Sequence, residues 1–386
     1  MNLVICQKSK VNDWLDHFKM HYWEDSNICD LTSWKTSEFS NMLKTACMCI
    51  AWERSILVIN YELAFRRKEL LKLKDFTLML DESSLIQNEQ AKRTKFIMKL
   101  QPANVILLSG TPTSGKYENL WTQIHLLGWP ISKELYEKQY VNWKLTEDDG
   151  SGVRHKIVNV DDPYKNVDRL KTKMRQYGCR FLKTEEVMDL PEQVFSMVSV
   201  SASKEYRKFR KDKVITVQEN ELVGDTLFTK MLYERMLCGH YNQEKLKALE
   251  DLIESTNDRL IVFYNFNDEL KAIEDLCLRL ERPLSIVNGH EKDLSIYEEY
   301  ANSVTAIQYQ AGAMGLNLQK ANKIIYFTLP LSSELFEQSK KRTHRIGQDR
   351  TCFYYLMICK GSIEEKIYRT LEMRKDYTDK LFEEDE

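Results

Sequence analysis

The sequence alternates short apolar runs with longer amphipathic segments, and this alternation restricts the fold more than any other feature. In residues 1–131 a helical pattern such as Glu89–Leu100 separates runs of strand length. Strands that alternate with helices predict a parallel sheet with crossover helices, and therefore an α/β fold. The predicted strands are Leu3–Cys6, Ile56–Asn60, Phe76–Leu80 and Val105–Leu108.

The same pattern returns near Glu244 and ends in a helix from about Ser362, where Ile363, Ile367 and Leu371 are four residues apart. Residues 132–180 are polar, include the loop Glu147–Gly152 and lack clear strands, which favours a linker or helical insertion. We therefore predict a first lobe over 1–131, its end plus the insertion over 132–240, and a second lobe over 241–386. The second set of strands is Leu260–Tyr264, Leu284–Val287, Thr305–Gln308, Lys323–Phe327 and Cys352–Ile358.

The amino-acid composition is that of a globular protein. Hydrophobic residues make up 43% and charged residues 30%, as in globular proteins, and no apolar run is long enough to cross a bilayer. The net charge of −2 means that any contact with nucleic acid depends on local basic patches. The nine cysteines are scattered, and Cys47 and Cys49 lack the second ligand pair of a zinc site. Reduced thiols predict a reducing compartment such as the cytoplasm.

Two acids follow the apolar run Leu78–Leu80. Hydrolysis of a nucleoside triphosphate needs one carboxylate for Mg²⁺ and a second that orients the attacking water. A strand end places Asp81 and Glu82 at the rim of a parallel sheet, where such ligands bind. By itself, a strand that ends in Asp-Glu is commonly only a solvated terminus.

A second loop, Ser109-Gly110-Thr111-Pro112, also follows an apolar run. Gly110–Lys116 has the G-x-x-x-x-G-K spacing of a phosphate loop. We reject that interpretation because Tyr117 stands where Ser or Thr should bind magnesium. In addition, Pro112 removes an amide that should point at phosphate.

Two further segments lie near the C-terminus. Residues 338–348 combine Gln338, Arg342, His344, Arg345 and Gln348. Arginines can neutralise the charge of a γ-phosphate in its transition state, although composition alone favours a solvated basic helix face. Residues 311–318 are rich in small side chains, and their glycines allow the backbone to approach a ligand or another domain closely.

In their order along the chain, these segments resemble motifs II, III, V and VI of superfamily 2 helicases. The ending His344-Arg345-Ile346-Gly347-Gln348 is similar to the Swi/Snf-type branch. Other segments agree with this resemblance over nearly the whole chain. They are Leu3–Ser9 with Asn12–Trp14 (motif Ia), Ile56–Glu62 (motif Ib), Arg180–Thr184 with Asp189–Pro191 (the end of the first lobe), Leu260–Phe266 (motif IV) and the turn Asn288-Gly289.

The resemblance implies two RecA-like lobes that hydrolyse ATP with Mg²⁺ in the cleft between them. It assigns Asp81 to Mg²⁺, Glu82 to the attacking water and Arg345 to the role of arginine finger. Other implied nucleotide-site residues are Arg342, Gln338, Gly315 and Asn317. Ser109, Gly110 and Thr111 would couple the nucleotide to the nucleic-acid track. Contacts to DNA, expected to be duplex and mainly through its backbone, would come from Lys8, Ser9, Asn60, Tyr61, Asn265 and Gln310.

Three departures from the family pattern stand out. Ser83-Ser84 replaces the usual Gly-His or Ala-His after the two acids, and Gln308-Tyr309-Gln310 replaces Ser-Thr-Arg before motif V. The family's phosphate loop should precede Leu3 by one helix, but the sequence starts at Met1. Three alternatives stay open: a truncated gene product, half of a split gene whose loop comes from a separate subunit or segment, and a degenerate non-hydrolysing binder.

The leading interpretation is an ATP-dependent DNA translocase or helicase-like motor. One rival is a non-hydrolysing nucleic-acid-binding or interaction protein derived from such a motor. A further rival is an ordinary phosphate-loop ATPase that uses Lys116. The absence of large chromatin-reading additions suggests a prokaryotic or phage setting.

Overall fold

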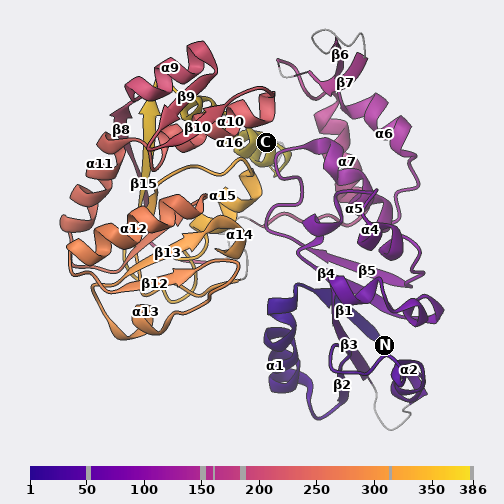
Figure 1. Cartoon of the computed structure of the whole chain (residues 1–386). Coiled ribbons are helices and arrows are strands. Elements are labelled where there is room, and N and C mark those ends of the chain that lie inside the picture. Colours follow the sequence, from indigo (N-terminus) through magenta and orange to yellow (C-terminus); the bar gives the residue numbers. More distant parts are fainter. Residues whose placement is uncertain (49–53, 148–153, 160, 183–187, 313–314, 383–386) are drawn as a thin grey trace. The chain divides into compact units, whose positions relative to one another are not determined.

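The structure is a computed structural model that describes residues 1–48, 54–147, 154–159, 161–182, 188–312 and 315–382. The chain divides into two compact units (Figure 1). Unit 1 comprises Met1–Phe181 together with Asp376–Glu386, and unit 2 comprises Leu182–Lys375. Within the described residues, no helix is long and apolar enough to span a membrane.

Unit 1 is built on a five-stranded, fully parallel sheet in the order β2-β3-β1-β4-β5. Four of the strands coincide with the predicted apolar runs, whereas β2 was not predicted because only Ile28 and Cys29 are apolar in it. The strands are β1 (Asn2–Cys6), β2 (Ser26–Asp30), β3 (Arg54–Asn60), β4 (Thr77–Asp81) and β5 (Asn104–Leu108).

Helices of unit 1 cover this sheet. Leu3, Ile5, Leu57, Ile59, Leu78 and Leu80 are fully buried in one core with residues of α2 and α4. The predicted helix Glu89–Leu100 is shorter in the structure, because Asn88 Oδ1 first accepts a hydrogen bond from Gln90 N in a turn. The helices are α1 (Val11–Tyr22), α2 (Phe39–Met48), α3 (Tyr61–Ala64), α4 (Lys92–Ile97) and α5 (Trp121–Leu126), with the short 3₁₀ helices η1 (Lys8–Lys10), η2 (Lys68–Lys72), η3 (Ser83–Ile86) and η4 (Tyr117–Leu120).

The segment 132–180 contains strands, contrary to the sequence prediction. Helices α6 (Lys133–Tyr140) and α7 (Val167–Gln176) flank an antiparallel hairpin of β6 (Trp143–Glu147) and β7 (Arg154–Val158). The hairpin was missed because it buries no continuous apolar face: Leu145 is 66% exposed and Ile157 42%. Of the predicted loop Glu147–Gly152, the residues after Glu147 lie outside the described part of the chain.

Unit 2 contains a six-stranded parallel sheet in the order β12-β13-β11-β14-β15-β8. The five predicted strands are present, and the sixth, β8, pairs with β15 along nine residues. This second α/β pattern therefore starts with β8, not near Glu244 as predicted. The strands are β8 (Gln193–Ser201), β11 (Leu260–Tyr264), β12 (Leu284–Val287), β13 (Val304–Gln308), β14 (Lys323–Tyr326) and β15 (Cys352–Lys360).

Between β8 and β11 a small layer forms from α9 (Lys204–Asp212), the hairpin of β9 (Val214–Val217) and β10 (Asn220–Val223), and α10 (Leu227–Cys238). Tyr206, Phe209, Ile215 and Leu222 form its buried core. The other helices of unit 2 are α11 (Gln243–Glu254), α12 (Asn267–Arg279), α13 (Ser295–Glu299), α14 (Tyr309–Gly312) and α15 (Ser333–Lys340). Helix α16 (Ile363–Phe382) begins in unit 2, and its residues from Asp376 belong to unit 1. Two parallel-sheet lobes with an insertion in the first confirm the predicted fold class.

Candidate functional site

The acidic pair of unit 1 lies at the carboxyl end of β4, as predicted. The half-buried Trp14 and the buried Tyr61 fix its position by hydrogen bonds. Trp14 Nε1 donates to Asp81 Oδ2 at 2.9 Å, and the Tyr61 hydroxyl donates to the main-chain oxygen of Asp81 at 2.9 Å. Burial, together with the Asp81 carboxylate, raises the pKa of Tyr61 well above its ordinary value. Tyr61 therefore stays a hydrogen-bond donor, and the orientation of Asp81 is set before any ligand binds.

Glu82 has a left-handed backbone conformation, with φ 53° and ψ 57°. Such a conformation is unfavourable for a residue with a Cβ. It turns the chain out of the sheet and into η3. Consequently the two adjacent carboxylates do not alternate across the sheet as they would in a continued strand.

The Ser83 side chain links the acidic pair to the Ser109–Pro112 loop. The Ser83 hydroxyl donates to Gln123 Oε1 at 2.9 Å, and Gln123 Nε2 donates to the carbonyl oxygen of Pro112 at 2.7 Å. Gln87 Nε2 also donates to this oxygen, at 3.0 Å. Ser83 and Gln123 are both buried. Buried hydrogen bonds therefore connect the acidic strand end to this loop, at the place where Ser83-Ser84 replaces the usual Gly-His or Ala-His.

Most amides of the loop Gly110–Lys116 donate hydrogen bonds within the protein. Thr111 N donates to Ser109 Oγ at 3.1 Å, and Gly115 N donates to Thr113 Oγ1 at 3.0 Å. Ser114 N and Lys116 N donate to the carbonyl oxygens of Thr111 and Thr113, respectively. Since Pro112 has no N–H, few amides remain for a phosphate. This geometry supports the rejection of the loop as a phosphate cradle.

In unit 2 the structure brings together the two segments predicted to face the nucleotide. Arg345 Nη1 donates to the carbonyl oxygen of Leu316 at 3.4 Å, and Leu318 N donates to that of Arg342 at 3.1 Å. Gln348 Nε2 reaches the carbonyl oxygen of Ala321 at 2.8 Å. Gly315 has a positive φ of 69° at this point, which favours glycine. Hydrogen bonds thus join the segment Arg342–Gln348 to the segment Leu316–Ala321 within unit 2.

The remaining predicted nucleotide residues lie beside this junction. Asn317 is exposed, and Gln338 on α15 is half-buried, with Nε2 3.4 Å from Glu334 Oε1. His344 Nε2 lies 2.8 Å from the carbonyl oxygen of Pro191, at the entrance to β8. Ala313 and Met314 of the same predicted motif, like Lys183 and Thr184 of another and Cys49 of the CxC pair, lie outside the described residues.

The predicted DNA contacts differ in exposure. Lys8, Ser9 and Gln310 are exposed, as a phosphate contact requires. Tyr61 has no exposed surface, and Asn60 is buried with Nδ2 donating to Glu62 Oε2 at 2.7 Å. Asn265 Nδ2 donates to Thr328 Oγ1 at 2.9 Å and braces the ends of β11 and β14. The Tyr61 hydroxyl and the Asn60 amide nitrogen thus donate to protein groups in this structure.

A magnesium ion fits the donors at Asp81. Mg²⁺ prefers oxygen ligands and is usually held by one or two carboxylates plus phosphate and water. Asp81 is only half-buried, and the indole of Trp14 contacts one of its two carboxylate oxygens. Asp81 would hold the ion, and Glu82 would orient a water toward the nucleotide.

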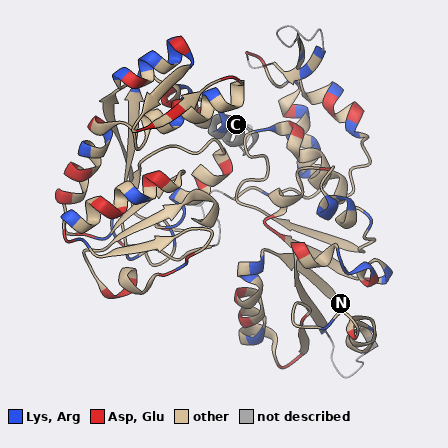
Figure 2. Ribbon diagram, in the orientation of Figure 1, with Lys and Arg blue, Asp and Glu red and all other residues tan. Residues whose placement is uncertain are grey.

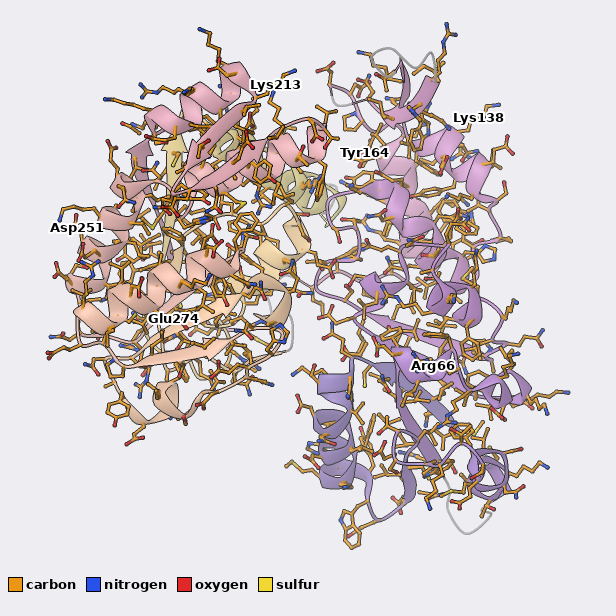
Figure 3. The ribbon with its side chains drawn as sticks, viewed as in Figure 1. Arg66, Lys138, Tyr164, Lys213, Asp251 and Glu274 are labelled. Atoms are coloured by element: carbon orange, nitrogen blue, oxygen red, sulfur yellow. The ribbon has the colours of Figure 1, made fainter. Side chains whose placement is uncertain are left out.

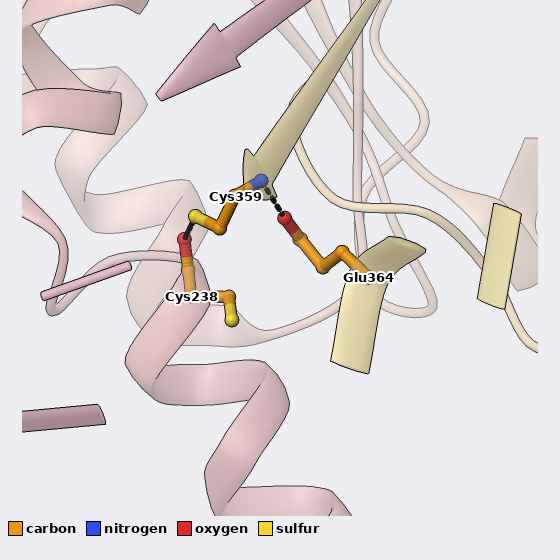
Figure 4. A group of neighbouring side chains, drawn as sticks. All are labelled: Cys238, Cys359 and Glu364. Atoms are coloured by element: carbon orange, nitrogen blue, oxygen red, sulfur yellow. Dashed lines mark hydrogen bonds between the residues drawn. The ribbon is translucent and has the colours of Figure 1, made fainter. Parts of the chain in front are cut away.

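Within the described residues, one group of three side chains has metal-ligand spacing: Cys238, Cys359 and Glu364 in unit 2 (Figure 4). Its donors are already engaged. Lys245 Nζ contacts both Glu364 oxygens, at 2.6 and 2.8 Å, and Cys359 N donates to Glu364 Oε2 at 2.9 Å. The Lys245 ammonium supplies the positive charge that a metal would bring, so we assign this group to the core.

Sequence reasoning missed two residues of the site. Trp14 was noted only as part of a motif, and its contact with Asp81 joins positions 67 residues apart. Gln123 carried no signal at all, because a glutamine on a short helix is ordinary. Only the fold places it between Ser83 and Pro112.

Two protein-family models match the chain: the SNF2-related domain over residues 1–245 and the helicase conserved C-terminal domain over residues 244–347. Among curated proteins, the chain is similar to the ISWI chromatin-remodeling complex ATPase ISW1 of Saccharomyces cerevisiae. The two are 23% identical, over 97% of this chain and 35% of that protein. The putative ATP-dependent helicase/translocase YwqA of Bacillus subtilis is 25% identical, over 80% of this chain and 36% of that protein.

The chain thus spans about a third of the length of these relatives, which come from eukaryotes and bacteria. They do not support the expected prokaryotic or phage setting over a eukaryotic one. Among solved structures, the Sulfolobus solfataricus SWI2/SNF2 ATPase core in complex with dsDNA covers 98% of this chain and 81% of that one. Its TM-score is 0.40 and its identity 18%.

Proposed function

Because this chain belongs to the SNF2-related family and carries a helicase-like ATPase domain, we propose that it acts as an ATP-dependent motor that translocates on duplex DNA. The observation that carries the proposal is the arrangement at Asp81 and Glu82. A strained, pre-oriented pair of carboxylates at the end of a parallel strand is suited to Mg²⁺ and water. A buried hydrogen-bond relay, Ser83–Gln123–Pro112, joins this pair to the Ser109–Pro112 loop. Such a relay can transmit the state of the nucleotide to the surface that holds DNA.

Each unit contributes its own part. Asp81 would bind Mg²⁺ and Glu82 the attacking water, while Ser109, Gly110 and Thr111 would move with the relay. In unit 2, Arg345 would neutralise the γ-phosphate in the transition state, with Arg342, Gln338, Gly315 and Asn317 beside it. Lys8, Ser9 and Gln310 would contact DNA phosphates without reading the bases.

One edge of the sheet in unit 1 offers a surface for a further strand. Strand β5 is the last of the sheet and pairs only with β4 among the described residues. It is almost entirely apolar, yet Ile106 is 45% exposed and Leu108 38% exposed. Parallel sheets are normally covered on both faces by their crossover helices, so a further strand along β5 would pair the open edge and its crossover helix would cover these side chains. We propose that the phosphate-binding segment, from this protein or a separate subunit, adds there.

Arg345→Ala provides the test, in a version of the chain joined to an upstream phosphate-binding segment. ATP hydrolysis with saturating duplex DNA should fall by roughly 10³–10⁵, as for other arginine fingers, while nucleotide affinity stays close to that of the parent. The reason is that the arginine acts mainly in the transition state. Steady-state hydrolysis and nucleotide affinity are measured side by side.

Arg279→Ala is the matched control, since Arg279 is 61% exposed and pairs with Glu250 on the surface. A surface ion pair is worth only about 0–1 kcal/mol, so this variant should hydrolyse ATP at the parental rate. A parent protein that binds duplex DNA but shows no DNA-stimulated hydrolysis would favour the rival, a non-hydrolysing binder. An Arg345→Ala rate within about threefold of the parent would mean that Arg345 is not the finger.

A further inference from the structure

Helix α9 of unit 2 presents a uniformly cationic outer face. Its inner positions, Tyr206 and Phe209, are buried in the core between α9 and the β9–β10 hairpin. The opposite positions of a helix lie two residues away, and there the side chains are Lys204, Arg207, Lys208 and Lys211, all exposed. None of the ion pairs found among the described residues involves any of these four cations.

The excess of basic residues on α9 is not shared by the helices α11 and α12 of the same unit. Helices α11 and α12 each carry four acidic and two basic residues, whereas α9 carries five basic and two acidic residues. Figure 2 shows where the Lys and Arg residues (blue) and the Asp and Glu residues (red) lie on α9, α11 and α12. Figure 3 labels Asp251 on α11 and Glu274 on α12, and also Lys213, a further exposed cation directly after α9.

Such a face works against the stability of its own helix. Lys204 and Lys208, like Arg207 and Lys211, are four residues apart, where like charges repel. Lys204 also occupies the first turn, where the helix dipole disfavours a cation. The helix is held instead by Ser203, whose hydroxyl accepts from Tyr206 N at 3.1 Å, and by its buried aromatic residues. An external polyanion would remove this repulsion.

We propose that the α9 face, defined as Lys204, Arg207, Lys208 and Lys211, binds the phosphate backbone of duplex DNA. The proposal rests on the proposed function, and it adds a contact surface outside the motifs that the resemblance assigned. From Lys204 to Lys211 the helix rises about 10 Å, which matches the rise of roughly three phosphates of one strand measured along the duplex axis. Contacts of these cations with backbone phosphates carry no sequence information, so the contact is expected to be independent of sequence.

The test compares two triple variants of the 386-residue chain. Lys204→Gln/Lys208→Gln/Lys211→Gln removes three cations from the α9 face. Lys247→Gln/Lys271→Gln/Lys366→Gln removes the same number from exposed positions on α11, α12 and α16 of the same unit. Binding to a fluorescent duplex is measured between about 50 and 200 mM salt. Circular dichroism checks that both variants keep the helix content of the parent.

The α9 variant should bind more weakly, and the slope of log affinity against log salt should become shallower by about 0.9 per cation engaged, up to roughly 2.7. The control variant should keep the parental slope. If the parent binds duplex DNA and both variants keep its slope, the α9 face does not bind DNA. Binding to polyglutamate is measured in parallel as a probe for an acidic protein. If the α9 variant loses binding to polyglutamate but keeps its binding to DNA, the face binds an acidic protein, which also overturns the proposal. A parent that binds no DNA at all refutes the proposed function itself.

Discussion

At the scale of single residues, His240 is a buried titratable group that the proposed mechanism does not use. Its ring is 7% exposed, and neither nitrogen has a hydrogen-bond partner. Burial lowers its pKa below the ordinary value of 6.5; the carboxylate of Asp268, 4.0 Å away, raises the pKa and Lys271 lowers it. The folded protein therefore binds this proton less readily than the unfolded chain, so stability should decrease as pH falls below about 6.5.

His240→Leu should weaken this pH dependence, because it removes the proton that only the unfolded chain binds. The free energy of unfolding is measured by denaturant titration at a pH above 6.5 and again well below it. The parent should lose more stability between the two than the variant does. His290→Leu is the control, since His290 is exposed. Equal pH dependence in the parent and in His240→Leu would show that His240 is not held neutral.

At the scale of elements, α5 matters because it ties the acidic strand end to a loop. Thr122 Oγ1 donates to the carbonyl oxygen of Ile86 at 2.8 Å, and the adjacent Gln123 bridges Ser83 and Pro112. Gln123→Leu should destabilise unit 1 by about 1–3 kcal/mol, because the buried Ser83 hydroxyl loses its acceptor. It should also reduce DNA stimulation of ATP hydrolysis more than basal hydrolysis, because the relay carries the coupling.

Denaturant unfolding and hydrolysis with and without DNA measure the two effects. Gln101→Leu makes the same change at an exposed loop position and should alter stability by less than about 0.5 kcal/mol. Gln123→Glu separates the two hydrogen bonds, since a carboxylate can still accept from Ser83 but cannot donate to Pro112. If Gln123→Leu lowers stability but leaves the DNA stimulation intact, Gln123 is structural only.

At the scale of the whole molecule, a net charge of −2 offers no general attraction for DNA. Binding should come from local cations and should therefore weaken steeply with salt and be equal for duplexes of unrelated sequence. Affinity for two such duplexes, measured at several salt concentrations, checks this. Sequence-specific binding that resists a several-fold increase in salt would contradict the backbone-contact proposal.

The sequence by itself determined the two parallel sheets, because a strand buried on both faces must be a continuous apolar run, as in β1, β3 and β11. It also placed Asp81 and Glu82 at the end of a strand, because the apolar run before them stops there. Only the tertiary structure decided what depends on partners distant in sequence. The mostly polar strand β2 and the edge strand β8 are defined by their pairing, and the β6–β7 hairpin buries no continuous apolar face. Trp14, Tyr61 and Gln123 acquire their roles from contacts that no local pattern encodes.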